Sequence, residues 1–147
     1  QMCIRDSGVA TQKDGLLPLT QMALAVIANT GYHDYEGPAF DLEERARLIA
    51  DLKDFNILIL RNHGLLTVGK TVSEAFMWMY RAERACRFQL SFQQAGAEAQ
   101  QISGPVQQIS IERSKKAISS SGHRPIGEFE WPALLRKLNR QNPGFDH

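Results

Sequence analysis

The pair His63-Gly64 is the feature of this chain most suited to chemistry, because it follows an apolar run. Residues 57–60 are all isoleucine or leucine, and such a short run predicts a strand buried on both faces. Gly64 allows the left-handed backbone of a tight turn, so the turn would hold the His63 imidazole rigidly at the strand end. A rigid imidazole suits a metal ligand, whose ring nitrogen must lie about 2.0 to 2.1 Å from the ion. A histidine that only closes the turn by hydrogen bonds is the more ordinary interpretation of this segment alone.

The other histidines and the cysteines give weaker signals. We expect His33 to make hydrogen bonds in a loop rather than to bind metal, and His123 and His147 to lie at the surface. Cys3 and Cys86 have neither the spacing of a metal site nor that of a disulfide framework. Because Cys86 falls within a helical apolar stripe, we expect it to pack in the core rather than to act as a nucleophile.

The composition predicts one soluble globular domain with a real core. Of the 147 residues, 43% are hydrophobic and 22% are charged, and the net charge is +1. A nearly neutral chain has no global field to attract nucleic acid or an anionic membrane. No apolar run approaches the ~20 residues of a membrane span, and the first residues do not resemble a signal peptide. We therefore expect a cytoplasmic protein that binds neither nucleic acid nor membrane.

Three helices are predicted to position the strand and its histidine. The first begins near Pro18, which suits a first turn, and ends at Gly31 as a C-cap. An ordered loop over residues 32–40 leads to a second helix over residues 41–53, opened by a capping-box-like pair. The third and longest helix follows a capping box at residues 71–74. Its expected apolar face contains Val72, Ala75, Phe76, Met79, Glu83 and Cys86.

Three segments, in the same order along the chain, resemble the class II aldolase/adducin family. They are GLLPLTQ at residues 15–21, YHDYEG at residues 32–37 and RNHGL at residues 61–65. The likeness covers residues 8–98. The middle segment is closer to the adducin-like branch, whereas the ending WPALL at residues 131–135 resembles bacterial members.

The resemblance implies a layered α/β/α domain with a central, largely antiparallel sheet. Catalytic members of the family assemble as tetramers whose active sites lie between subunits, so a homo-oligomer is expected. Residues 1–7 match nothing in the family and are expected to be a non-native or misread leader. Residues 8–98 would then be the C-terminal part of the family domain, truncated at its N-terminal side. Residues 99–147 are expected to be a peripheral tail, with a short amphipathic helix at 131–138 anchored by Trp131.

The resemblance also implies a role for two residues. His63 matches the third metal-binding histidine of the family, whose divalent ion, expected to be Zn²⁺, acts as a Lewis acid. Tyr35 matches a tyrosine that protonates the leaving aldehyde oxygen in a neighbouring subunit's site, and an aromatic packed at a subunit interface is an equally good interpretation. The family's His-x-His pair and a glutamate lie upstream of the GLLP segment, yet no histidine precedes His33 here. The chain alone is therefore expected to bind metal poorly and to be inactive.

These features leave three functions open for the parent protein. The first is a divalent-metal-dependent aldehyde-lyase that performs aldol cleavage of a small sugar or sugar phosphate. The second is a noncatalytic adducin-like scaffold that oligomerises and supports actin and spectrin binding. A weaker third possibility is a small-molecule binding module that keeps the pocket without the chemistry. Ligands for His63 just upstream of Gly8 would favour the enzyme.

Overall fold

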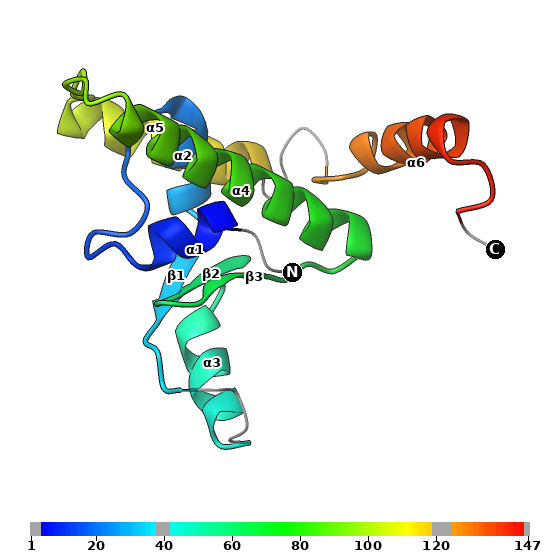
Figure 1. The fold of residues 1–147 in the computed structure, drawn as a ribbon, viewed down its shortest axis with the longest axis horizontal. Helices are drawn as coiled ribbons and strands as arrows, with labels where there is room; N and C mark the ends of the chain where they lie inside the picture. The colour runs from blue at the N-terminus through cyan, green and yellow to red at the C-terminus, as the bar shows by residue number, and fades with distance from the viewer. Residues whose placement is uncertain (1–3, 38–41, 119–124, 146–147) are drawn as a thin grey trace.

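The fold is described from a computed structural model, which places residues 4–37, 42–118 and 125–145. Four helices and three strands are interspersed along the first two thirds of the described chain, and two further helices follow (Figure 1). The helices are α1 (Ile4–Ala10), α2 (Gln21–Ile27), α3 (Glu44–Leu52), α4 (Val72–Gln94), α5 (Gly104–Ile118) and α6 (Glu130–Gln141), and the strands are β1 (Thr30–His33), β2 (Ile57–Leu60) and β3 (Gly64–Thr67).

The three described strands form one sheet with β2 in the centre. β1 runs parallel to β2, with Thr30 opposite Ile57, whereas β3 runs antiparallel to β2, with Gly64 opposite Leu60. The first three residues of β2 are at most 1% exposed, as expected of a central strand covered on both faces. The segment after His63 is therefore the return strand of a hairpin. Of the two described pairings, only β2–β3 is antiparallel.

Helices cover both faces of the sheet, which confirms the predicted α/β/α class. Helices α1, α2 and α4 lie on one side, and α3 lies on the other (Figure 1). A Cβ atom on Gly31 would lie 2.8 Å from the backbone oxygen of Asp51, so only a glycine in β1 lets α3 approach this closely. Gly31 is thus a strand residue, and its predicted role as a helix C-cap is wrong.

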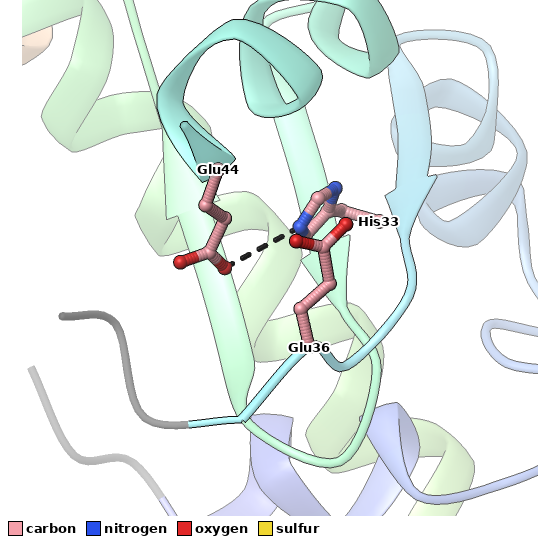
Figure 2. Close-up of side chains that lie close together, drawn as sticks. All are labelled: His33, Glu36 and Glu44. Carbon is pink, nitrogen blue, oxygen red and sulfur yellow. Dashed lines mark ion pairs between the residues drawn. The ribbon is translucent and has the colours of Figure 1, made fainter. Parts of the chain in front are cut away.

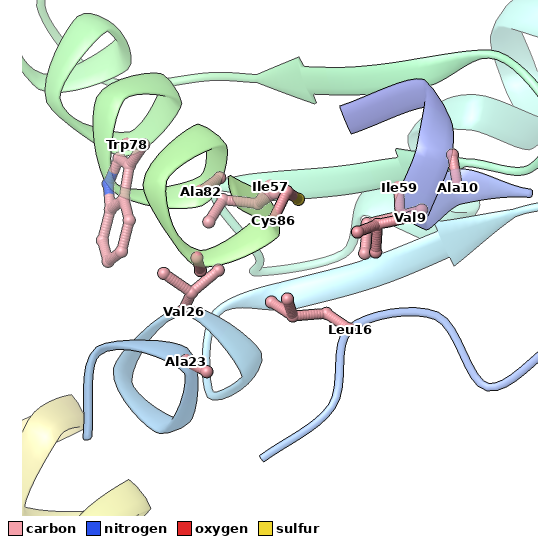
Figure 3. Packing of buried hydrophobic residues seen from close by; sticks show 11 residues of the cluster. Val9, Ala10, Leu16, Ala23, Val26, Ile57, Ile59, Trp78, Ala82 and Cys86 are labelled. Atoms are coloured by element: carbon pink, nitrogen blue, oxygen red, sulfur yellow. The ribbon is translucent and has the colours of Figure 1, made fainter. Parts of the chain in front are cut away.

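The core lies between the sheet and the three helices on one side. Val9 and Ala10 of α1 lie beside Ile59 of β2, whereas Ile57 of β2 lies beside Ala82 and Cys86 of α4 (Figure 3). The core as a whole also contains Leu16, Ala23, Val26, Trp78 and Ala85. Cys86 is 1% exposed, so its predicted packing in the core is confirmed.

The predicted helix limits were partly wrong. Helix α2 starts later than Pro18, because the side-chain oxygen of Thr20 accepts a 3.1 Å hydrogen bond from the amide of Ala23 and caps the helix there. Residues 32 and 33, predicted in a loop, belong to β1. The predicted opening of the second helix includes Asp41, which lies outside the described residues, and α3 has no side-chain cap at Glu43.

The capping box before the long helix is confirmed, whereas its predicted buried face is wrong. The Thr71 hydroxyl accepts from the Glu74 amide at 3.1 Å, and the Glu74 carboxylate accepts from the Lys70 amide at 2.7 Å. Val72 and Phe76 are 75% and 42% exposed. Of the predicted face, only Cys86 is among the buried residues of α4, and the others are Met77, Trp78, Ala82, Ala85 and Gln89. The first turns of α4 have apolar residues on all sides of the helix. The spacing of apolar residues in the sequence therefore could not indicate which face packs against the sheet.

Residues after the long helix form two further helices. The pair Gly104-Pro105 opens the 15-residue helix α5, because a proline at the first turn needs no amide partner. Helix α6 confirms the predicted amphipathic helix. The centres of the Trp131 and Phe76 rings lie 5.2 Å apart in an edge-to-face arrangement, so α6 contacts the start of α4. In the described part of the chain, no helix combines the length and the apolar character needed to cross a bilayer.

Candidate functional site

The turn between β2 and β3 presents His63 at the end of the hairpin. The His63 amide donates to the Leu60 carbonyl at 3.0 Å, and Asn62 adopts the left-handed conformation with φ of 57°. Gly64 was expected to supply that conformation, but it is an extended, buried residue of β3. Asparagine tolerates the left-handed region because its short polar side chain can bond locally. The exposed imidazole of His63 is therefore carried by a short and well-defined turn.

Helix α1 lies directly beside this turn. The Ser7 hydroxyl donates a 2.8 Å hydrogen bond to the His63 carbonyl oxygen. Asp6 is 2% exposed, and its carboxylate lies 3.4 Å from where a Cβ on Gly64 would be. Burial raises the pKa of the Asp6 carboxyl, although hydrogen bonds from the Ser7 and Leu65 amides oppose the rise. Residues 4–7, expected to belong to a leader, thus form part of α1 next to His63.

The three sequence segments that carry the family resemblance converge around the hairpin turn. The Leu16 amide donates to the Tyr32 hydroxyl at 3.1 Å, and the Arg61 guanidinium lies 4.3 Å from the centre of the Tyr32 ring. Arg61 also donates to the carbonyls of Gln12 and Lys13 at 3.0 and 3.1 Å. Direct contacts therefore join segments that are far apart in the sequence.

Tyr35 and His63, the two predicted site residues, line the same cavity of about 180 Å³. Tyr35 is 56% exposed, so its phenol faces largely outward at the rim. Besides these two, the lining consists of His33, Asp34, Gly37, Glu44, Leu48, Leu60, Arg61 and Leu66. The structure brings together an imidazole, a phenol and acidic side chains, which are groups suited to metal binding and proton transfer.

His33, expected to be a loop residue, is buried in this cavity at the end of β1. It is 3% exposed, and its Nδ1 lies 2.8 Å from Oδ2 of Asp51. Its Nε2 lies 3.5 Å from Oε1 of Glu44, without a hydrogen bond (Figure 2). Among the described residues, one group of three side chains could hold a metal ion, namely His33, Glu36 and Glu44, with ligand atoms within 4.8 Å of one another. His63 is not a member of that group.

A sequence signal for this cluster existed, but it was incomplete. Glu44 and Asp51 are seven residues apart, which places both carboxylates on one face of a helix. Nothing in the local sequence shows that β1 pairs in parallel with β2 and so brings His33 under that face. His123 and His147 lie outside the described residues.

Comparison with known proteins agrees with this architecture. The family described as "Class II Aldolase and Adducin N-terminal domain" matches residues 5–90, a range that includes three residues of the expected leader. A crystal structure of an aldolase II superfamily protein from Pseudomonas syringae superposes with a TM-score of 0.85 at 42% identity, covering 96% of this chain and 55% of that one.

Relatives by sequence come from both branches of the family. A Pseudomonas aeruginosa protein named "Putative aldolase class 2 protein" is 45% identical over 143 residues, covering 93% of this chain. Mouse alpha-adducin is 36% identical over 141 residues, covering 90% of this chain and 19% of the adducin. The chain belongs to the class II aldolase and adducin family. It spans about half, 52%, of the length of the bacterial relative.

Proposed function

We propose that this chain is part of a longer class II aldolase-type protein that cleaves a carbon–carbon bond in a small sugar or sugar phosphate with a divalent metal ion, in our expectation Zn²⁺. One observation supports this proposal most strongly: the Ser7 hydroxyl bonds to the His63 carbonyl at 2.8 Å. The family's His-x-His pair lies just before the position of Gly8. This chain has Arg5, Asp6 and Ser7 there. Imidazoles in place of these residues would stand beside His63 and complete a ligand set.

The residues present fit such a metal site in part. His63 is exposed at the end of a short hairpin, so its ring nitrogens are accessible to an ion. When bound, the ion would stabilise negative charge that develops on the oxygen of the donor fragment. His63 alone would hold an ion weakly, because affinity arises from several ligands placed in advance. The 147-residue chain is therefore expected to lack the activity of the whole protein.

Tyr35 is proposed as the proton donor. Its phenol lies at the rim of the His63 cavity, where it could protonate the oxygen of the departing aldehyde. Its exposure of 56% also fits a residue that reaches toward a neighbouring subunit in a homo-oligomer such as a tetramer. A cytoplasmic location follows from the same proposal, since sugar phosphates are intracellular substrates.

The test uses the longer protein with its own upstream sequence. Aldehyde release from a panel of short ketoses and ketose phosphates is measured with and without a chelator, for wild type, His63→Ala and Tyr35→Phe. We expect chelation and His63→Ala to abolish turnover, and Tyr35→Phe to lower kcat by about 10²- to 10⁴-fold. Tyr80→Phe, an exposed tyrosine on α4, is the matched control and should retain activity. Absence of turnover across the panel, with or without metal, would reject the lyase.

A noncatalytic adducin-like scaffold is the second candidate. The 36% identity to mouse alpha-adducin favours it, as do Leu42 and Ile49, which are 77% and 65% exposed beside and on α3. Exposed apolar side chains at and beside a helix are typical of a surface that meets another protein. Oligomer mass by light scattering and co-sedimentation with actin filaments test this candidate. Actin binding without aldol cleavage would support the scaffold over the enzyme.

A further inference from the structure

We propose that His33, Glu36 and Glu44 form a binding site for a divalent transition-metal ion that is separate from the His63 position. The three side chains come from the end of β1, the segment after it and the start of α3 (Figure 2). The site does not depend on the proposed lyase activity, and it would serve a scaffold equally well. Its metal would link α3 to the sheet.

The His33 imidazole is already oriented as a metal ligand. Its Nδ1 lies 2.8 Å from Oδ2 of Asp51, and an ionised carboxylate only accepts hydrogen bonds. Nδ1 therefore carries a proton, and in the neutral form of the ring Nε2 has the free lone pair. Metal-binding histidines are commonly held this way, with the second ring nitrogen donating to a carboxylate that fixes the tautomer and raises ligand basicity.

Nε2 of His33 is buried without a hydrogen-bond partner and is aimed at carboxylates. The His33 side chain is only 4% exposed, and Oε1 of Glu44 lies 3.5 Å from Nε2. Figure 2 shows the Glu36 and Glu44 carboxylates on the same side of the imidazole as Nε2. A lone pair that faces carboxylate oxygens is unfavourable in a buried site, and a cation between them removes this repulsion.

The charge around the imidazole favours a divalent ion. Asp51, Glu44 and Glu36 provide three carboxylates, and Arg47 pairs with Glu36, so these four side chains together carry a formal charge of −2. Nε of Arg47 donates to both oxygens of Glu36 at 2.8 and 2.9 Å. The guanidinium is thus a competitor that holds Glu36 when no ion is bound.

The donor set indicates the class of metal. One imidazole nitrogen with two carboxylates suits Zn²⁺ or Mn²⁺, whereas Ca²⁺ and Mg²⁺ prefer sites made of oxygen alone. Ligand atoms that share one ion at about 2.1 Å lie roughly 3 to 3.5 Å apart, so the present separations of up to 4.8 Å must shorten. Rotation of the two glutamate side chains, which are 14% and 32% exposed, can provide that movement.

The experiment measures metal binding by the 147-residue chain itself. Zn²⁺ affinity is determined by equilibrium dialysis, and Mn²⁺ is added to observe selective broadening of the His33 imidazole signals in NMR. No histidine precedes His33 in this chain, so the His-x-His pair cannot contribute. We expect Glu44→Gln and His33→Gln to weaken Zn²⁺ binding at least about tenfold, and Asp51→Asn by about 10- to 100-fold.

Two variants serve as controls. Asp54→Asn removes an exposed carboxylate just after α3 and should leave Zn²⁺ affinity within twofold of wild type. Arg47→Gln should strengthen Zn²⁺ binding several-fold, because it removes the guanidinium that donates to Glu36. Circular dichroism verifies that each variant is folded. If His33→Gln does not fold, the result for Glu44→Gln decides the outcome. The proposal is overturned if the wild type does not bind Zn²⁺, or if Glu44→Gln binds it as well as the wild type does. It is also overturned if NMR shows a His33 ring that is protonated on both nitrogens and whose signals Mn²⁺ does not broaden.

Discussion

The amide of Leu17 donates a 2.7 Å hydrogen bond to Oε1 of Gln89, a side chain that is 2% exposed in α4. The Nε2 of Gln89 donates to Oε1 of Gln12 at 2.7 Å and to the carbonyl of Gly15 at 2.8 Å. One buried glutamine therefore satisfies the backbone of the GLLP segment, which in turn lies against Tyr32 and the site.

Gln89→Ala is expected to destabilise the protein by about 2 to 3 kcal/mol, because it leaves buried backbone groups without partners. Urea unfolding measures the change. Gln93→Ala is the matched control, since Gln93 is exposed and also contacts Gln12, and its effect should stay within about 0.5 kcal/mol. Equal losses in the two variants would show that Gln89 does not anchor the segment.

Gly15→Ala is expected to reduce stability strongly and to disturb the Tyr32 contact. Gly15 has φ of 62°, and a Cβ there would lie 2.5 Å from the Tyr32 hydroxyl oxygen. The left-handed backbone and the steric overlap together should destabilise by roughly 2 to 4 kcal/mol. Thermal unfolding tests this expectation against Gly104→Ala, where a Cβ meets nothing within 4 Å. A similar melting temperature for both variants would contradict it.

The contact between Phe76 and Trp131 should hold α6 on the domain. In a double-mutant cycle, Phe76→Ala and Trp131→Ala are expected to couple by about 0.5 to 1.5 kcal/mol, the typical value of an edge-to-face pair. Trp131→Ala should also speed hydrogen exchange across α6 while β2 stays protected. Phe88→Ala provides the additive control with Trp131→Ala. If the free-energy changes of Phe76→Ala and Trp131→Ala are also additive, the two side chains do not interact.

Asp6→Asn should change the pH dependence of stability. Burial raises the pKa of the Asp6 carboxyl above its ordinary value of 3.8, so the fold favours its neutral form. That stabilisation is full below pH 3.8 and is lost as the pH rises through the raised value. Asparagine stays neutral and keeps an oxygen for the Ser7 amide, now bonded at 2.7 Å.

The stability of Asp6→Asn relative to wild type is therefore expected to increase from pH 3.5 to pH 7. Melting temperatures across this range measure the difference, with the exposed Asp14→Asn as a control that should show a smaller trend. A constant difference between Asp6→Asn and wild type at all pH values would mean that Asp6 is not penalised by burial.

The sequence predicted those features that depend on neighbouring residues. The Thr71 cap, the buried strand at residues 57–60 and the amphipathic helix α6 all follow from local patterns, and all are present. The errors arose at features that depend on contacts between segments far apart in the sequence. Gly31 allows α3 to pack closely against β1. Which face of α4 is buried depends on the elements that pack against this helix.

The candidate site shows the same division. His63 and Tyr35 were selected from their segments, and the structure brings them to one cavity. The buried state of His33 was missed, because it requires the parallel pairing of β1 with β2 and the packing of α3 above it. Its partners Glu44 and Asp51 show the spacing of one helix face, but only the fold supplies the histidine between them.

The central claim is that, in the longer protein, His63 binds a metal ion together with imidazole ligands at the positions before Gly8, where this chain has Arg5, Asp6 and Ser7. Its most direct test is the Zn²⁺ affinity of the longer protein, with its own upstream sequence, compared with that of His63→Ala. Both proteins carry His33→Gln, so that the second proposed site does not contribute. We predict tight binding of one ion and a loss of at least about 100-fold in His63→Ala. Equal affinity in the two proteins, or no bound ion in either, would contradict the claim.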